Sequence, residues 1–178
     1  MLRGDFQAPV AVPTPGLHLC HVPRQRLTRR VNVSVVVLAL GVAVLDSLTK
    51  LWARHELANG PRHVVGPLWF RLTYNTGISF SINRDGPIWT TLIALVIVLV
   101  VAIVAVQAAP GLATVGFGLL LGGGVANEVN RLVVVPHQVT DFISVGWFPV
   151  FNVADAAVTL GFCALIVAML RGSTLVEK

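Results

Sequence analysis

Two aspartates near the end of the chain, Asp141 and Asp155, bracket the segment DFISVGWFPVFNVAD and could do chemistry together. Gly146 and Pro149 lie between them, so the chain can turn there and bring the two carboxyl groups close. Two carboxylates in a site of low dielectric constant cannot easily both ionise, so one of them keeps a proton. The ionised acid can then take a proton from water while the neutral acid polarises a carbonyl group, which is suited to peptide hydrolysis. A buried structural pair that binds no substrate is the alternative interpretation of this spacing.

Asn152 lies three positions before Asp155, directly ahead of an apolar run. One interpretation is structural, with Asn152 as a helix N-cap and Asp155 as a favourable charge in the first helical turn. The nearby Asp141 favours a functional role for both residues. We expect four aromatic side chains to anchor this segment at the level of the lipid headgroups: Phe142, Trp147, Phe148 and Phe151.

Other polar residues lie within or beside apolar segments, where each ionisable group is a candidate functional residue. Asp46 and Lys50 have the i, i+4 spacing and the order that favour a helical ion pair. Either Lys50 extends to the membrane boundary and Asp46 neutralises it, or the pair takes part in substrate binding. The segment GGGVANEVNRL places three further polar residues on one helical face, where we expect them to line a cavity: Asn127, Asn130 and Arg131.

The chain that positions these residues is strongly apolar. Of its 178 residues 55% are hydrophobic and only 12% are charged, whereas about a quarter of the residues of a soluble domain are charged. Apolar runs cover about 33–52, 88–109, 112–126 and 153–170, and each predicts a transmembrane helix. We therefore predict an all-α membrane protein with four transmembrane helices in a single domain, 31–172. Residues 1–30 are predicted to form a disordered basic cytoplasmic tail and residues 173–178 a short C-terminal tail.

Four spans place both termini on one side of the membrane. Basic residues at 24–30, with Arg171 and Lys178, predict that this side is cytoplasmic, so the segments 54–87 and 128–151 lie outside. Within the first exterior segment, PLWFRLTYNTGISFSI predicts two strands separated by a break at NTG. The net charge of +5 comes mostly from arginines that flank apolar runs, so we expect no nucleic-acid partner.

Five segments occur in one order along the chain: LDSLTK, YNTGISF, GGGVANEVNRL, VTDFI and FNVAD. Together they resemble the lipoprotein signal peptidases (signal peptidase II), which are bacterial membrane aspartyl proteases. The resemblance implies an intramembrane aspartyl endopeptidase that removes signal peptides from diacylglyceryl-modified prolipoproteins by cleaving before the lipidated cysteine. It implies Asp141 and Asp155 as the catalytic pair and a small exterior β-cradle in the first loop. It also implies a set of substrate-binding residues: Asp46, Lys50, Asn75, Asn127, Arg131 and Asn152.

The same resemblance implies a multi-pass protein of the bacterial cytoplasmic (inner) membrane, with its active site towards the exterior face. We expect a monomer whose partners are the lipidated prolipoprotein and membrane lipids, and no metal or organic cofactor. The chain contains no H-E-x-x-H motif, so a zinc protease would lack its usual ligands.

Two positions depart from the family pattern. The family has Asp before the Arg of its GNxxDR motif, whereas this chain has Asn130 before Arg131, and Glu128 stands where the family is commonly apolar. The amide keeps the size and hydrogen bonding of the acid but loses the charge that could pair with Arg131. A non-catalytic paralogue that binds lipidated peptides is therefore one alternative. A small transporter or proton-conducting subunit, suggested by Asp46 and Lys50, is another.

Overall fold

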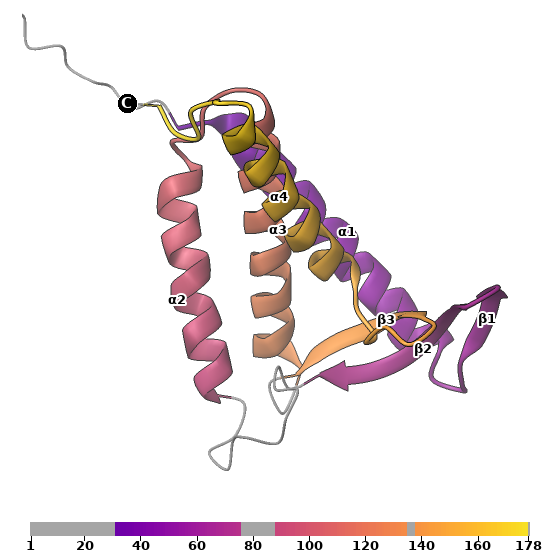
Figure 1. The fold of residues 1–178 in the computed structure, drawn as a ribbon. Coiled ribbons are helices and arrows are strands. Elements are labelled where there is room, and N and C mark those ends of the chain that lie inside the picture. The colour runs from indigo at the N-terminus through magenta and orange to yellow at the C-terminus, as the bar shows by residue number, and fades with distance from the viewer. Residues whose placement is uncertain (1–30, 76–87, 135–137, 178) are drawn as a thin grey trace, which may run out of the picture.

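The computed structural model describes residues 31–75, 88–134 and 138–177, which form four helices and three strands. The helices run side by side, and the sheet lies across one end of the bundle, opposite the C-terminus (Figure 1). The elements follow each other in the order α1 (Val33–Glu56), β1 (Arg62–Val65), β2 (Leu68–Asn75), α2 (Ile88–Ala105), α3 (Leu112–Val133), β3 (Val139–Val145) and α4 (Val153–Leu170).

Each predicted apolar run contains a helix, and the helices α1, α2, α3 and α4 begin where the runs begin. Two of them continue beyond the apolar residues, because a helix satisfies its own backbone hydrogen bonds. Helix α1 extends to Glu56, and helix α3 extends to Val133. Asn127, Asn130 and Arg131 therefore lie within the last turns of α3.

Three of the described helices, α1, α3 and α4, are long and apolar enough to cross a membrane. Helix α2 has no charged residue and is apolar apart from Thr90 and Thr91, but its apolar segment Trp89–Ala105 is shorter than the other three helices. Large apolar side chains are exposed along the outer faces of the helices, for example Leu40, Ile103 and Leu160. Such a continuous apolar surface suits a lipid environment and not water.

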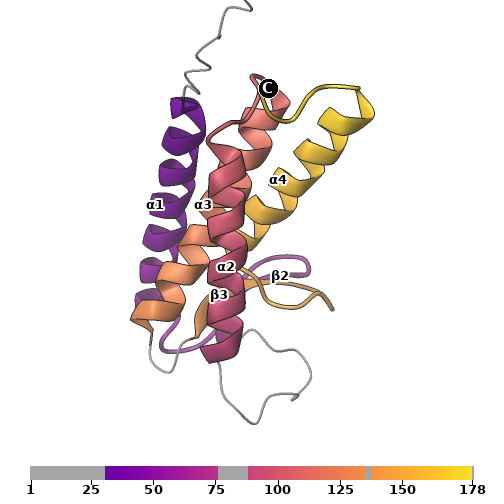
Figure 2. The same ribbon diagram turned by 90° about the vertical axis from the view of Figure 1, so that its left-hand side faces the viewer.

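Helix α3 lies between α1 and α4 (Figure 2), and its glycines allow both neighbours to approach closely. A Cβ atom on Gly122 would lie 2.6 Å from the carbonyl oxygen of Ala39 in α1. A Cβ atom on Gly123 would lie 2.5 Å from the carbonyl oxygen of Ala154 in α4. This close packing positions the next turn of α3, which carries Asn127, between α1 and the start of α4.

The sheet is antiparallel in the order β1–β2–β3, with Thr73 of β2 opposite Asp141 of β3. The strand predicted before NTG is present as β2, whereas the second predicted strand lies after Asn75, outside the described residues. The structure adds two features to the prediction. The first is β1, which joins β2 through a turn at Gly66, where φ is 51°. The second is strand β3, which was not predicted at all, so the sheet joins the two segments that were predicted to be exterior instead of belonging to the first one alone.

The aromatic side chains between the two aspartates do not share one environment. Phe142 is buried and packs edge-on against Trp52, with ring centroids 6.1 Å apart, so its predicted role as a membrane-surface anchor is wrong. Trp147, with 93% of its surface exposed, and Phe148 project from the turn after β3, as an anchor requires. Phe142 instead fixes β3 to the end of α1.

Candidate active site

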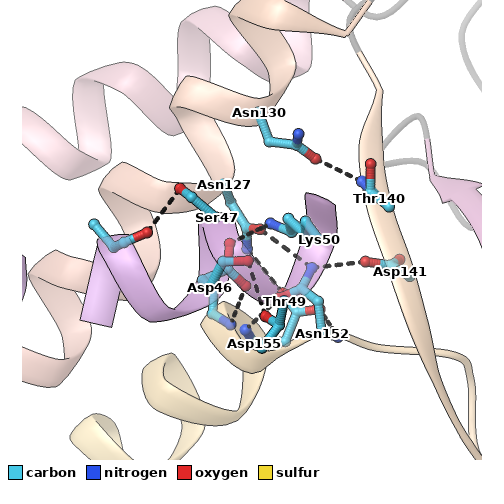
Figure 3. A network of polar contacts seen from close by, with 12 residues as sticks. Asp46, Ser47, Thr49, Lys50, Asn127, Asn130, Thr140, Asp141, Asn152 and Asp155 are labelled. Atoms are coloured by element: carbon cyan, nitrogen blue, oxygen red, sulfur yellow. Dashed lines mark hydrogen bonds and ion pairs between the residues drawn. The ribbon is translucent and has the colours of Figure 1, made fainter. Parts of the chain in front are cut away.

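The side chain and backbone of Asn152 bring Asp141 and Asp155 together. Its Nδ2 donates a hydrogen bond to Oδ1 of Asp141 over 2.7 Å, and its backbone N–H donates to Oδ2 of Asp155 over 3.1 Å (Figure 3). Asp141 lies on β3, whereas Asp155 lies in the first turn of α4. One residue therefore sets the relative position of two carboxyl groups from different elements.

The backbone around Asn152 explains how this contact forms. The chain turns at Gly146, where φ is 52°, and Phe151 then pairs with Ile143 through hydrogen bonds in both directions. Asn152 follows immediately and caps α4, with its Oδ1 accepting a hydrogen bond of 2.9 Å from the backbone N–H of Asp155. The cap that we considered as an alternative is present, and it is part of the arrangement that joins the two acids.

Asn127 of α3 connects this pair to the rest of the bundle. Its Nδ2 donates to Oδ1 of Asp155 over 2.9 Å, and its Oδ1 accepts from Nζ of Lys50 over 2.8 Å. The same Oδ1 accepts a longer bond, 3.2 Å, from Nδ2 of Asn152. Asn127 therefore has both ends of its amide occupied, which fixes its orientation.

Asp46 and Lys50 form the predicted ion pair, with Nζ and Oδ2 2.7 Å apart. Their exposed fractions are 0% and 1%, so the alternative in which Lys50 extends to the membrane boundary is wrong. Lys50 points inward because Asn127 offers it an acceptor, and Asp46 accepts a hydrogen bond of 2.8 Å from the backbone N–H of Ala154. A buried ion pair needs such additional bonds to offset its loss of hydration.

The environment of Asp141 disfavours its ionised form. Only 1% of this residue is exposed, and burial, followed by repulsion from Asp155, raises its pKa to about 6. Hydrogen bonds from Asn152 and from Asn75, the last residue of β2, and the charge of Lys50 act in the opposite direction. Asp141 can therefore bind and release a proton near neutral pH.

The predicted polar face of α3 divides into two parts. Asn127 and Arg131 line one cavity, whereas Asn130 lines a separate cavity between α3 and α1. Oδ1 of Asn130 accepts a hydrogen bond of 2.6 Å from the backbone N–H of Thr140, the residue before Asp141. Asn130 thus holds the strand that carries Asp141, a contact that does not require a charge.

Arg131 pairs with Glu128, one helical turn earlier, and not with residue 130. Sequence reasoning noted Glu128 only as a departure from the family pattern. Its i, i+3 spacing from Arg131 could have identified the pair.

The cavity next to Asn127 lies between α2, α3 and α4 and has a volume of about 170 Å³. Its polar end is formed by Asn127, Glu128 and Arg131. The remaining wall is apolar and consists of Ala94, Ile97, Val98, Val101, Leu120, Leu121, Gly124 and Val158. The cavity therefore offers an apolar chain a place beside Asn127, which bonds to Asp155. A larger hollow of about 400 Å³ lies on the sheet, between Trp69, Arg71 and Ser144.

Comparison with known proteins agrees with this architecture. The family model of signal peptidase (SPase) II matches residues 38–171. The lipoprotein signal peptidase of Rhodococcus jostii is 38% identical over 158 residues, which covers 84% of this chain and 79% of the relative. The lipoprotein signal peptidase of Gloeobacter violaceus is 37% identical over 143 residues, which covers 76% of this chain and 81% of the relative.

A solved bacterial membrane enzyme has the same fold. Its TM-score is 0.69 at 24% identity, over 78% of this chain and 94% of that chain. The matched segment of the family model contains α2, α3, α4 and all three strands, together with most of α1. The chain belongs to the signal peptidase II family.

Proposed function

We propose that the protein is a bacterial membrane endopeptidase of the aspartic type that removes signal peptides from diacylglyceryl-modified prolipoproteins, cleaving before the lipidated cysteine. Family membership and the relatives named lipoprotein signal peptidase support the activity. One observation carries the aspartic mechanism: Asn152 bonds to both Asp141 and Asp155 and so holds two carboxyl groups at one point. Asp141 and Asp155 are the proposed catalytic pair.

The different surroundings of the two acids support a separate role for each. Asp141, whose pKa is raised to about 6, takes up a proton before the reaction, and in this protonated form it donates a hydrogen bond to the carbonyl oxygen of the scissile peptide. Asp155, oriented by Asn127 and by the backbone of Asn152, takes a proton from water, whose oxygen attacks the carbonyl carbon. When the C–N bond breaks, Asp155 returns that proton to the leaving nitrogen.

The remaining polar residues support this pair. Asn127 and Asn152 position the carboxyl groups, and Lys50 with Asp46 holds Asn127 and the start of α4 in place. Asn75 donates to Asp141 from the sheet, which we propose acts as the cradle for the substrate. Arg131 lines the apolar cavity, which is suited to the hydrophobic part of a signal peptide.

We place the protein in the inner membrane as a monomer with four membrane-spanning helices, both termini in the cytoplasm and the sheet on the exterior face. The apolar outer faces of α1, α2 and α4 support contact with membrane lipids. Three of the helices have the required length, and the exposed Trp147 beside the sheet suits the membrane surface.

The experiment that tests this function compares wild type with Asp141→Asn and Asp155→Asn in cleavage of a diacylglyceryl-modified prolipoprotein peptide. Both variants should lose at least about 10³-fold in kcat/KM, because removing one member of a catalytic unit removes most of its effect. Glu177→Gln, which changes an exposed acid near the C-terminus, serves as a control and should cleave like wild type. Normal cleavage by either aspartate variant would contradict the assignment.

The non-catalytic alternative rests on Asn130, and the structure gives it little support. The side chain of Asn130 binds the backbone of Thr140, a role that an aspartate would fill equally well, and Arg131 has Glu128 as its acidic partner. Wild-type protein that binds the lipidated peptide without cutting it, and gains activity on Asn130→Asp, would favour this alternative.

A further inference from the structure

The two carboxylate oxygens of Glu128 differ in whether they have a bonding partner. Its Oε1 pairs with Arg131, whereas its Oε2 is buried and has no hydrogen-bond partner among the described residues. Only 4% of Glu128 is exposed, so water does not readily hydrate this oxygen. An unsatisfied buried acceptor is unfavourable, and more so when it is charged. Such a group suggests a partner that arrives with a ligand.

The position of Glu128 indicates where that ligand lies. Glu128 lines the cavity between α2, α3 and α4 together with Asn127, which binds Asp155. Within the described part of this cavity wall, Oε2 of Glu128 is the one buried acceptor without a hydrogen bond. Glu128 therefore lies at the polar end of an otherwise apolar cavity, next to Asn127, which bonds to Asp155 of the proposed catalytic pair.

A peptide that enters this cavity brings a matching donor. A signal peptide must unwind near the bond that is cut, so its backbone N–H groups there lose their helical acceptors. In a cavity of low dielectric constant each unpaired N–H is unfavourable, and a carboxylate oxygen is its strongest available partner. The apolar wall suits the signal-peptide side of the scissile bond better than the polar mature protein.

We propose that Glu128 is a specificity-determining residue: its Oε2 accepts a hydrogen bond from a backbone N–H of the unwound signal-peptide segment, while Arg131 holds the carboxylate in position. This proposal rests on the proposed function, since it assumes that a signal peptide occupies the cavity. The competing view is that Glu128 only neutralises Arg131. In that case no substrate atom would depend on it.

The test uses diacylglyceryl-modified peptides in which one backbone N–H at a time, on the signal-peptide side and excluding the scissile bond, is replaced by an ester oxygen. Wild type should lose about tenfold in kcat/KM, or ~1.4 kcal/mol, at one position of this series. Glu128→Gln can still bind Arg131 through its amide oxygen, but it presents an NH₂ group to the cavity. Glu128→Gln should cleave the all-amide peptide with a kcat/KM about tenfold below that of wild type. For this variant, the ester that slows wild type should change kcat/KM by less than about twofold relative to the all-amide peptide.

Three controls make the outcome decisive. Glu177→Gln should show the wild-type ester profile, and thermal unfolding should show that Glu128→Gln is folded. Glu128→Asp keeps the charge opposite Arg131 but withdraws the oxygen by one methylene, so it should reduce the ester effect to an intermediate value. Equal ester penalties in wild type and in the Glu128 variants at every position would overturn the proposal.

A binding measurement separates this inference from the proposed function. The affinity of the same peptides is measured with Asp141→Asn protein, with and without Glu128→Gln, by fluorescence anisotropy. If wild type does not cleave the all-amide peptide, the peptidase assignment fails. An ester penalty on affinity that disappears with Glu128→Gln would still support the contact, and its absence would reject it.

Discussion

Asp141→Asn should make the protein more stable at neutral pH while it abolishes cleavage. In the folded protein the pKa of Asp141 is about 6, against its usual 3.8, because burial disfavours the charge. This difference of about two units, at ~1.4 kcal/mol each, amounts to about 3 kcal/mol. The folded state binds this proton more tightly than the unfolded state. The contribution to stability is therefore present below about pH 4 and is lost as the pH rises to about 6.

The variant removes this penalty because asparagine stays neutral at every pH and keeps an oxygen that can accept from Asn152. We expect Asp141→Asn to exceed wild type by about 3 kcal/mol at pH 7, and to match it near pH 4. The measurement is reversible unfolding in detergent micelles at pH 4, 5, 6 and 7, with Glu177→Gln as a control that follows wild type. A gain that is the same at pH 4 and pH 7, or no gain at pH 7, would refute the reasoning.

Three further predictions concern the supports of the site. Asn152→Ser keeps a cap for α4 but loses the amide that donates to Asp141. The free energy of unfolding should therefore fall by only about 1 kcal/mol, while kcat/KM falls about 10²-fold. Unfolding and cleavage are measured on the same samples. Gly123→Ala should lower the free energy of unfolding by about 1–3 kcal/mol and remove most of the activity, because the new Cβ would lie 2.5 Å from the backbone of α4. Gly41→Ala, whose Cβ would have no atom within 4 Å, should be neutral or stabilising. Equal melting temperatures for the two variants would contradict this prediction. Lys50→Met leaves the buried charge of Asp46 without its partner and should cost about 3–5 kcal/mol, while the double variant with Asp46→Leu should recover much of that stability without recovering cleavage.

The sequence predicted the elements of this protein better than the contacts between them. The starts of all four helices followed from the apolar runs, and the Asp46–Lys50 pair followed from its helical spacing. The inward direction of Lys50 could not be predicted from this spacing, because its acceptor Asn127 lies 77 positions away along the chain. Local spacing cannot tell whether such a pair faces lipid or another helix.

Strand β3 escaped prediction for a related reason. Its segment Val139–Val145 is buried on both faces for most of its length, so it lacks the alternation of apolar and polar residues that marks a strand with one face in water. Its partner β2 comes from the other segment that was predicted to be exterior, and their pairing could not be read from either segment alone. The meeting of Asp141 with Asp155 was foreseen from Gly146 and the spacing of the acids, while Asn152 as their common link was not.

The capping box at the start of α4 has a consequence for how the protein is made. Asn152 and Asp155 supply both the cap of the last helix and the second half of the proposed catalytic pair. During synthesis, Asp141 emerges before either of them, so it lacks Asn152 and Asp155 until α4 has been made, although Asn75 of β2 is already present. If Asp141 and Asp155 are the catalytic pair that we propose, proteolytic competence coincides with the completion of biogenesis, and a nascent or truncated chain without its last helix would leave neighbouring membrane proteins uncut.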